Sequence, residues 1–151
     1  MSNEANKALV RRYLDEIWNH GHQEKEREFV AEKVIVHAPP VPGPGSAAGP
    51  PQLATMFRAA LPDLSLNSDI VFGDGDRVVL SYMVTGTHTG TPLFGVPASG
   101  RPLTISGINI FRIKDGKITE RWGLVDNAGL MQQLRAKQPA SGSTKESNND
   151  A

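Results

Sequence analysis

The chain has 151 residues, with 16 lysines and arginines against 16 aspartates and glutamates, four histidines and no cysteine. A zero net charge without a basic cluster argues against nucleic-acid binding and against attraction to anionic membranes. The absence of cysteine excludes disulfides, thiolate zinc sites and iron–sulfur clusters. We therefore expect a small or neutral partner, chemistry carried by carboxylates, imidazoles and hydroxyls, and, from the polar N-terminus, a cytoplasmic protein.

Two helices and a strand are expected before the first loop. Apolar residues recur at three- and four-residue spacing over residues 3–19, which predicts an amphipathic helix that Gly21 ends. Residues 23–32 predict a short charged helix, and Lys33–His37 has the β-branched content of a strand. Nine of the thirteen residues from Pro39 to Pro51 are proline or glycine, which predicts a loop inside the domain.

Beyond the loop, the pattern changes from helical to strand periodicity. A third helix is expected from Pro51 to the stop at Leu61-Pro62-Asp63. Turn sequences at 73–76 and 114–117 predict antiparallel hairpins. The segments expected to form strands are Leu64–Phe72, Arg77–His88, Leu103–Ile113 and Ile118–Asp126.

The order of these elements predicts an α+β domain, in which the N-terminal helices pack on one face of a curved antiparallel sheet. Residues 127–136 predict a last helix. We expect one domain over residues 1–137, and a disordered tail over residues 138–151 because that segment has no large apolar residue.

The four histidines differ in their surroundings. His20 and His22 flank a glycine without the spacing of a helical zinc site, so turn residues are expected there and no metal site. His37 ends a strand before the loop, where a half-desolvated ring could reach a ligand, or could instead bond a loop carbonyl. His88 ends another strand, and its simpler role is to stabilise the turn.

Asp126 is the most informative carboxylate. In a regular strand it shares a largely apolar row with Ile118 and Trp122, which would desolvate it, raise its pKa and suit it to proton transfer near neutral pH. The alternative is that Asp126 is the N-cap of the helix that follows. The sequence leaves both interpretations open.

Asn109 is an amide in a predicted apolar row with Ile105 and Phe111. Burying an amide costs ~1–3 kcal/mol unless it is hydrogen-bonded, so Asn109 either satisfies a neighbour or points a donor at a substrate oxygen. The aromatic residues are core by default, although a subset could contact a ligand. They include Trp18, Phe57, Tyr82, Phe94, Phe111 and Trp122.

Taken together, the ordered blocks of the sequence resemble the SnoaL-like polyketide cyclases, also described as ester cyclases of the NTF2-like superfamily. The resemblance covers roughly residues 5–136. Its blocks are NKALVRRYLDEIWNHG (6–21), GTHTG (86–90), FGVP (94–97), SGINIFR (106–112), DGKI (115–118) and WGLVDNAGL (122–130). Many members carry histidine where this chain has Arg121, and aspartate where it has Asn109.

The resemblance implies a cone-shaped α+β barrel around an apolar pocket, and a homodimer formed by pairing of sheets. It also implies an intramolecular aldol condensation on a hydrophobic carbonyl or ester substrate, with no cofactor and no metal, in which Asp126 is the general acid/base. We expect His37 to assist, and Asn109 and Trp122 to orient the substrate. Trp18, Phe57 and His88 are further candidate substrate contacts.

Other functions occur on this scaffold and stay open: isomerase, dehydratase, epoxide hydrolase, or a non-catalytic small-molecule-binding or dimerisation module. An epoxide hydrolase would need an Asp–Arg–Asp group. In a regular strand, Arg121 and Asp126 lie on opposite faces, which argues against that reaction.

Overall fold

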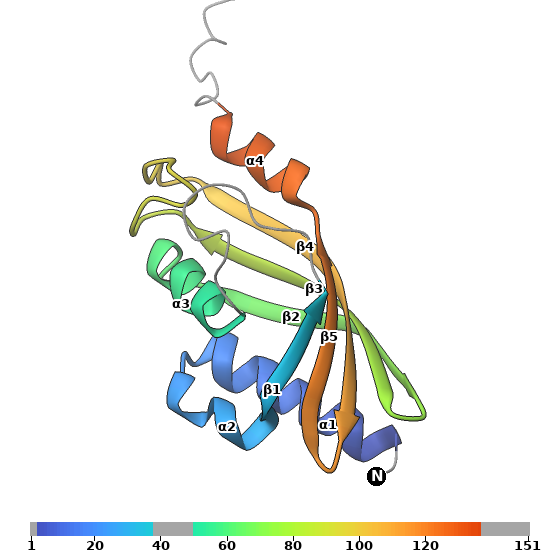
Figure 1. The fold of residues 1–151 in the computed structure, drawn as a ribbon. Coiled ribbons are helices and arrows are strands. Elements are labelled where there is room, and N and C mark those ends of the chain that lie inside the picture. The colour runs from blue at the N-terminus through green and yellow to red at the C-terminus, as the bar shows by residue number, and fades with distance from the viewer. Residues whose placement is uncertain (1–2, 38–49, 137–151) are drawn as a thin grey trace, which may run out of the picture.

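The N-terminal part of the chain forms helices and one strand (Figure 1). The computed structural model describes residues 3–37 and 50–136. Helix α1 (Asn3–Leu14) continues into a π-helical turn, η1 (Asp15–Asn19). A 3₁₀ turn, η2 (Gln23–Lys25), and the short helix α2 (Glu26–Phe29) lead directly into β1 (Val30–His37). The expected helix over residues 23–32 was therefore too long, and the strand begins earlier than predicted.

From residue 50 onward, the helices and strands of the structure lie close to the predicted segments. Two-residue turns join β2 to β3 and β4 to β5, and the second turn has positive φ angles at both Asp115 (52°) and Gly116 (74°), as a type I′ hairpin turn requires. The Pro/Gly-rich segment up to residue 49 and the predicted tail lie outside the described residues. The elements are α3 (Pro50–Ala60), β2 (Ser65–Asp74), β3 (Arg77–Thr87), β4 (Pro102–Lys114), β5 (Lys117–Val125) and α4 (Asn127–Arg135).

The five strands form one sheet in the order β1-β5-β4-β3-β2. The expected antiparallel sheet is in fact mixed, because β1 pairs in parallel with β5 while the other neighbours are antiparallel. The sheet is curved but does not close into a barrel. A parallel pair needs a long connection between its strands, and here three other strands lie within that connection.

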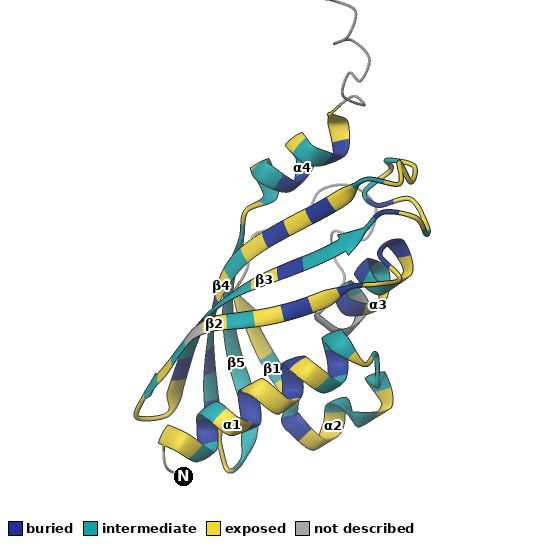
Figure 2. Cartoon of the chain, turned by 180° about the vertical axis from the view of Figure 1, so that it is seen from behind, coloured by how far each residue is buried: buried dark blue, intermediate teal, exposed yellow. Residues whose placement is uncertain are grey.

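One face of the sheet carries the core. We call it the inner face: Val78, Leu80 and Phe111 lie on it, are buried, and pack with the apolar side of α1. The opposite, outer face exposes apolar side chains, including Ile108 at 54% and Leu124 at 66%. Figure 2 shows the resulting alternation of buried and exposed residues along β2, β3 and β4. No helix in the described ranges is long and apolar enough to cross a membrane.

A β-bulge interrupts β5. Arg112 of β4 pairs with Glu120 while Ile113 pairs with Ile118, so Thr119 is an extra residue on β5. Ile118 is buried on the inner face, but Trp122 lies on the outer face as the partner of Ile110. The predicted single row from Ile118 to Asp126 is therefore wrong, because a bulge inverts the alternation of faces.

Candidate active site

Three polar side chains lie together on the apolar inner face: Asn109, Arg121 and Tyr82. Asn109 pairs with Gly123 on the neighbouring strand, and the position of a Cβ on Gly123 would lie 2.9 Å from Asn109 Oδ1 and 2.7 Å from Arg121 Nη2. A Cβ on Gly107 would lie 2.3 Å from the Tyr82 hydroxyl. The two glycines thus leave the space in which Tyr82 and Arg121 lie against the sheet.

Asn109 is the polar residue that sequence reasoning placed correctly. It is 6% exposed, and its Oδ1 has no hydrogen-bond partner among the described residues. A buried amide oxygen without a donor costs about 1–3 kcal/mol, so this atom has an unused capacity to bind a ligand.

Arg121 is the residue that sequence reasoning did not place in the site. Its register partner is Phe111, whose ring is buried and packs edge-on against Tyr13 of α1 at 6.1 Å. Burial raises the pKa of Tyr13 to about 12 and also raises the pKa of Tyr82, and the charge of Arg121 opposes the rise in both. The guanidinium therefore lies close to two phenols from different elements.

The raised pKa of Tyr13 predicts a loss of stability in alkali. The folded pKa lies above the ordinary value of 10.0, so the contribution to the free energy of unfolding is complete below pH 10 and is lost as the pH rises to about 12. The loss amounts to about 3 kcal/mol. Urea unfolding at pH 9 and pH 11.5 should show a smaller difference for Tyr13→Phe than for the wild type. An equal difference would contradict the prediction.

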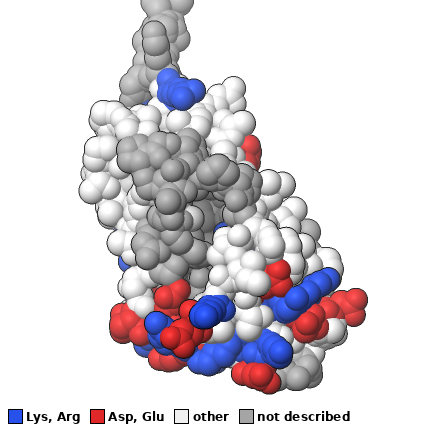
Figure 3. Space-filling view, viewed as in Figure 1, with Lys and Arg blue, Asp and Glu red and all other residues white. Residues whose placement is uncertain are grey.

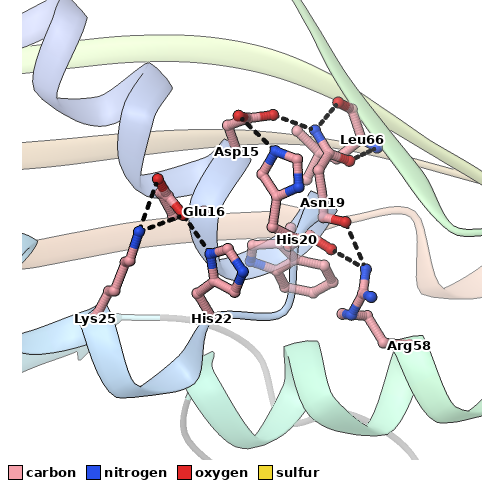
Figure 4. A network of polar contacts seen from close by, with 9 residues as sticks. Asp15, Glu16, Asn19, His20, His22, Lys25, Arg58 and Leu66 are labelled. Atoms are coloured by element: carbon pink, nitrogen blue, oxygen red, sulfur yellow. Dashed lines mark hydrogen bonds and ion pairs between the residues drawn. The ribbon is translucent and has the colours of Figure 1, made fainter.

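Trp18, Phe57 and Phe94 form a cluster of three aromatic rings in contact. Phe57 of α3 lies 5.9 Å from Trp18 and 5.8 Å from Phe94, measured between ring centroids. Arg58 donates from Nη1 to the carbonyls of Trp18 (2.9 Å) and Asn19 (2.8 Å). Figure 4 shows Arg58 reaching from α3 to this turn.

Asn19 attaches the same turn to the sheet. Its Oδ1 accepts from the amide of Leu66 on β2 at 2.6 Å, and its Nδ2 donates to the Leu66 carbonyl at 3.1 Å (Figure 4). Contacts from α3 and from β2 thus fix the π-helical turn that carries Trp18. A π-helical turn is uncommon and is frequently found at functional sites.

His20 and His22 both pair with carboxylates of the same turn. His20 Nε2 lies 3.2 Å from Asp15, and His22 Nδ1 lies 2.6 Å from Glu16. The hydrogen bond from His22, helped by Lys25, lowers the pKa of Glu16. Within residues 3–37 and 50–136, no group of three or more potential ligand side chains could hold a metal.

His88 is fully buried in the connection between β3 and β4. Its ring Nε2 lies 2.9 Å from the carbonyl of Thr91, and its backbone joins Gly100 and Arg101 across the loop. These hydrogen bonds agree with the simpler role expected for His88, which is to stabilise the turn. A substrate contact at His88 stays a prediction.

His37 and Trp122 lie on the outer face, away from Asn109. Their rings are stacked at 5.1 Å, and His37 Nε2 lies 2.6 Å from Glu120 Oε2. Glu120 in turn accepts from Arg112 at 2.9 Å. The structure therefore brings together two of the predicted site residues, but on the opposite side of the sheet from the polar group around Asn109.

Asp126 stands between β5 and α4 and caps the helix. Its Oδ1 accepts from the backbone N–H of Gly129 at 2.9 Å, which confirms the capping alternative. The residue is exposed, so the expected desolvation by an apolar row is wrong. A Cβ on Gly129 would lie 2.3 Å from the other oxygen, Oδ2, and no described residue hydrogen-bonds to that oxygen.

The family model described as "SnoaL-like polyketide cyclase" matches residues 8–134. This chain belongs to the SnoaL-like polyketide cyclase family. Two curated members of similar sequence are the aklanonic acid methyl ester cyclases DauD of Streptomyces sp. (strain C5) and DnrD of Streptomyces peucetius. Each is 30% identical over 132 residues, which cover 83% of this chain and 79% of DauD or 88% of DnrD.

A solved structure supports the same assignment. The crystal structure of a candidate polyketide cyclase from Acidithiobacillus ferrooxidans aligns with a TM-score of 0.72 and 28% identity, over 87% of this chain and 94% of that one. The SnoaL-like family therefore explains the curved sheet with helices on its inner face.

Proposed function

We propose that this SnoaL-like protein is a cyclase that performs acid/base chemistry, without a cofactor, on a hydrophobic carbonyl substrate. The observation that carries the proposal is the buried amide of Asn109, which has hydrogen-bonding capacity that no described residue uses. In Figure 3 most of the charged side chains gather at the lower end of the molecule, and the visible surface of the upper half is largely uncharged apart from one basic patch near α4. The family is described as polyketide cyclases and the two relatives are named as cyclases of a methyl ester, which supports a carbonyl substrate of polyketide type.

The proposed reaction is an intramolecular aldol addition. A base removes a proton from a methylene between two carbonyl groups, and the resulting enolate carbon attacks a ketone carbon in the same molecule. One C–C bond forms, the ketone oxygen becomes an alkoxide, and that alkoxide takes the proton back. We assign the proton transfers to Asp126 and the orientation of the substrate to Asn109, whose unpartnered Oδ1 can accept from an enol or hydroxyl O–H.

Proton exchange tests the proposal before any natural substrate is known. The wild-type protein is incubated in D₂O with a panel of polyketide-type keto esters and keto acids, and mass spectrometry follows deuterium entry at the acidic methylene. Chromatography separates a cyclised isomer of unchanged mass. Exchange or ring closure well above the buffer rate is the expected result. A panel that shows neither would remove the cyclase proposal and leave a non-catalytic binding module.

We also propose that the outer face pairs with a second copy of this chain. Ile108 and Leu124 are register partners there, and exposed Met83 lies on the adjacent strand. A two-fold axis would lay this patch on its own copy and remove it from water.

Light scattering on a sizing column should therefore give a dimer for the wild type and a monomer for Leu124→Asp. The control is Ala98→Asp, an exposed position in the loop between β3 and β4, outside the sheet. A wild-type monomer, or a dimer that survives Leu124→Asp, would contradict the proposed interface.

A further inference from the structure

Arg121 has no counter-ion among the described residues. The other sheet arginine with a buried neighbour, Arg112, pairs with Glu120 and Asp76. Within the described ranges, the side chain of Arg121 makes no ion pair and no hydrogen bond. The sequence of residues 38–49 contains neither aspartate nor glutamate. An acid from that segment therefore cannot neutralise the guanidinium.

The position of Arg121 makes this lack of a partner costly. The residue is half-buried on the inner face, and it lies against Gly123 beside a 6% exposed amide. An unpaired charge in such surroundings loses hydration without recovering it from a partner. A ligand that supplied an anion would recover that loss.

The neighbouring groups define the chemistry of such a ligand. The planar guanidinium offers two parallel N–H donors, which match the two oxygens of a carboxylate. Asn109 Oδ1, which has no donor, lies on the same side of Gly123 and can accept an O–H. A carboxylate with a hydroxyl or enol beside it satisfies both groups at once.

We propose that Arg121 binds a carboxylate of the substrate and Asn109 an adjacent hydroxyl or enol, so that this protein takes a free keto acid rather than a neutral ester. This inference rests on the proposed function for the reaction that follows binding. It differs from the ester in the names of the two relatives, and it depends on the residues that this chain places at 121 and 109.

A charge comparison tests the inference without any turnover. Calorimetry on the full chain measures the Kd of 2-naphthoate and of methyl 2-naphthoate, two ligands that differ in charge. We expect the acid to bind about 10- to 100-fold more tightly, the usual range for a charge-assisted contact. Arg121→Gln should abolish the preference and Arg121→Lys should retain part of it. Arg112→Gln, on the outer face, is the matched control and should leave the preference unchanged.

A second variant protects the test against simple loss of folding. Asn109→Asp replaces the side-chain NH₂ group by an oxygen and so places a carboxylate beside Arg121. It should abolish the preference for the acid, while the variant still unfolds in a cooperative thermal transition, which shows that it is folded.

Equal affinity of the wild type for acid and ester would overturn the inference, as would a preference that persists in Arg121→Gln. The two proposals fail separately. A protein that prefers the acid but never exchanges deuterium supports the carboxylate site and contradicts the cyclase reaction.

Discussion

Asp126→Asn is expected to reduce deuterium exchange and ring closure about 100- to 10,000-fold, the usual contribution of a general acid or base. The asparagine amide cannot take up the proton, but its oxygen can still accept from the Gly129 N–H, as Asp126 Oδ1 does at 2.9 Å. Asparagine and aspartate are equally good N-caps, so the free energy of unfolding should hardly change.

Asp126→Ala separates the two roles of this carboxylate. It should lose the same activity and in addition about 1 kcal/mol of stability, because the cap is removed. Rates are measured by the exchange assay and stability by urea unfolding. If Asp126→Asn kept the wild-type rate, Asp126 would be only a helix cap.

Gly90→Ala is expected to lower the free energy of unfolding by at least about 3 kcal/mol. A Cβ at this position would lie 1.9 Å from the carbonyl oxygen of Ala59 and 3.2 Å from that of Ala60. The same loop donates from the Gly90 amide to Ala60 at 3.0 Å and from the Thr91 amide to Ala59 at 3.1 Å. The added methyl group would push the loop off the C-terminal end of α3 and leave these carbonyls without donors.

The matched control lies in the same loop. Gly100 has a φ of +75° and nothing within 4 Å of its Cβ position, so Gly100→Ala should cost only the left-handed backbone strain of about 1–2 kcal/mol. Chemical unfolding of both variants compares the two effects. Equal losses would show that the close approach at Gly90 is not what limits stability.

Local patterns predicted much of the fold. The turn residues around Gly75 and Gly116 identified both hairpins, and the alternation along β4 correctly placed Asn109 among buried apolar residues. The parallel pairing of β1 with β5 could not be predicted in this way. It depends on residues far apart in the sequence, and the two strands carry no local signal that they are neighbours.

The site was harder to predict than the fold. Nothing in the sequence around Thr119 marks a bulge, so the apolar Ile118 suggested that Trp122 would also face the core. The bulge places Trp122 outward and leaves Arg121 on the inner face. One signal could have identified Arg121. It lies two residues before Gly123, so both residues share a face, and Gly123 pairs with the buried Asn109 on the neighbouring strand. For Asp126 the sequence left the acid/base and capping interpretations open; the structure confirms the cap, and the acid/base role stays a prediction.

The parallel β1–β5 pair has a consequence for how the chain folds during synthesis. Glu120, which holds His37 at 2.6 Å, follows it by 83 residues. At roughly 5–20 residues per second, a ribosome needs several seconds to make that stretch. Until β5 has been made, β1 has no strand to pair with, and its apolar side chains Ile35 and Val36 remain unpaired. We therefore expect β1 to be the last strand to join, and the hairpins β2–β3 and β4–β5 to fold before it.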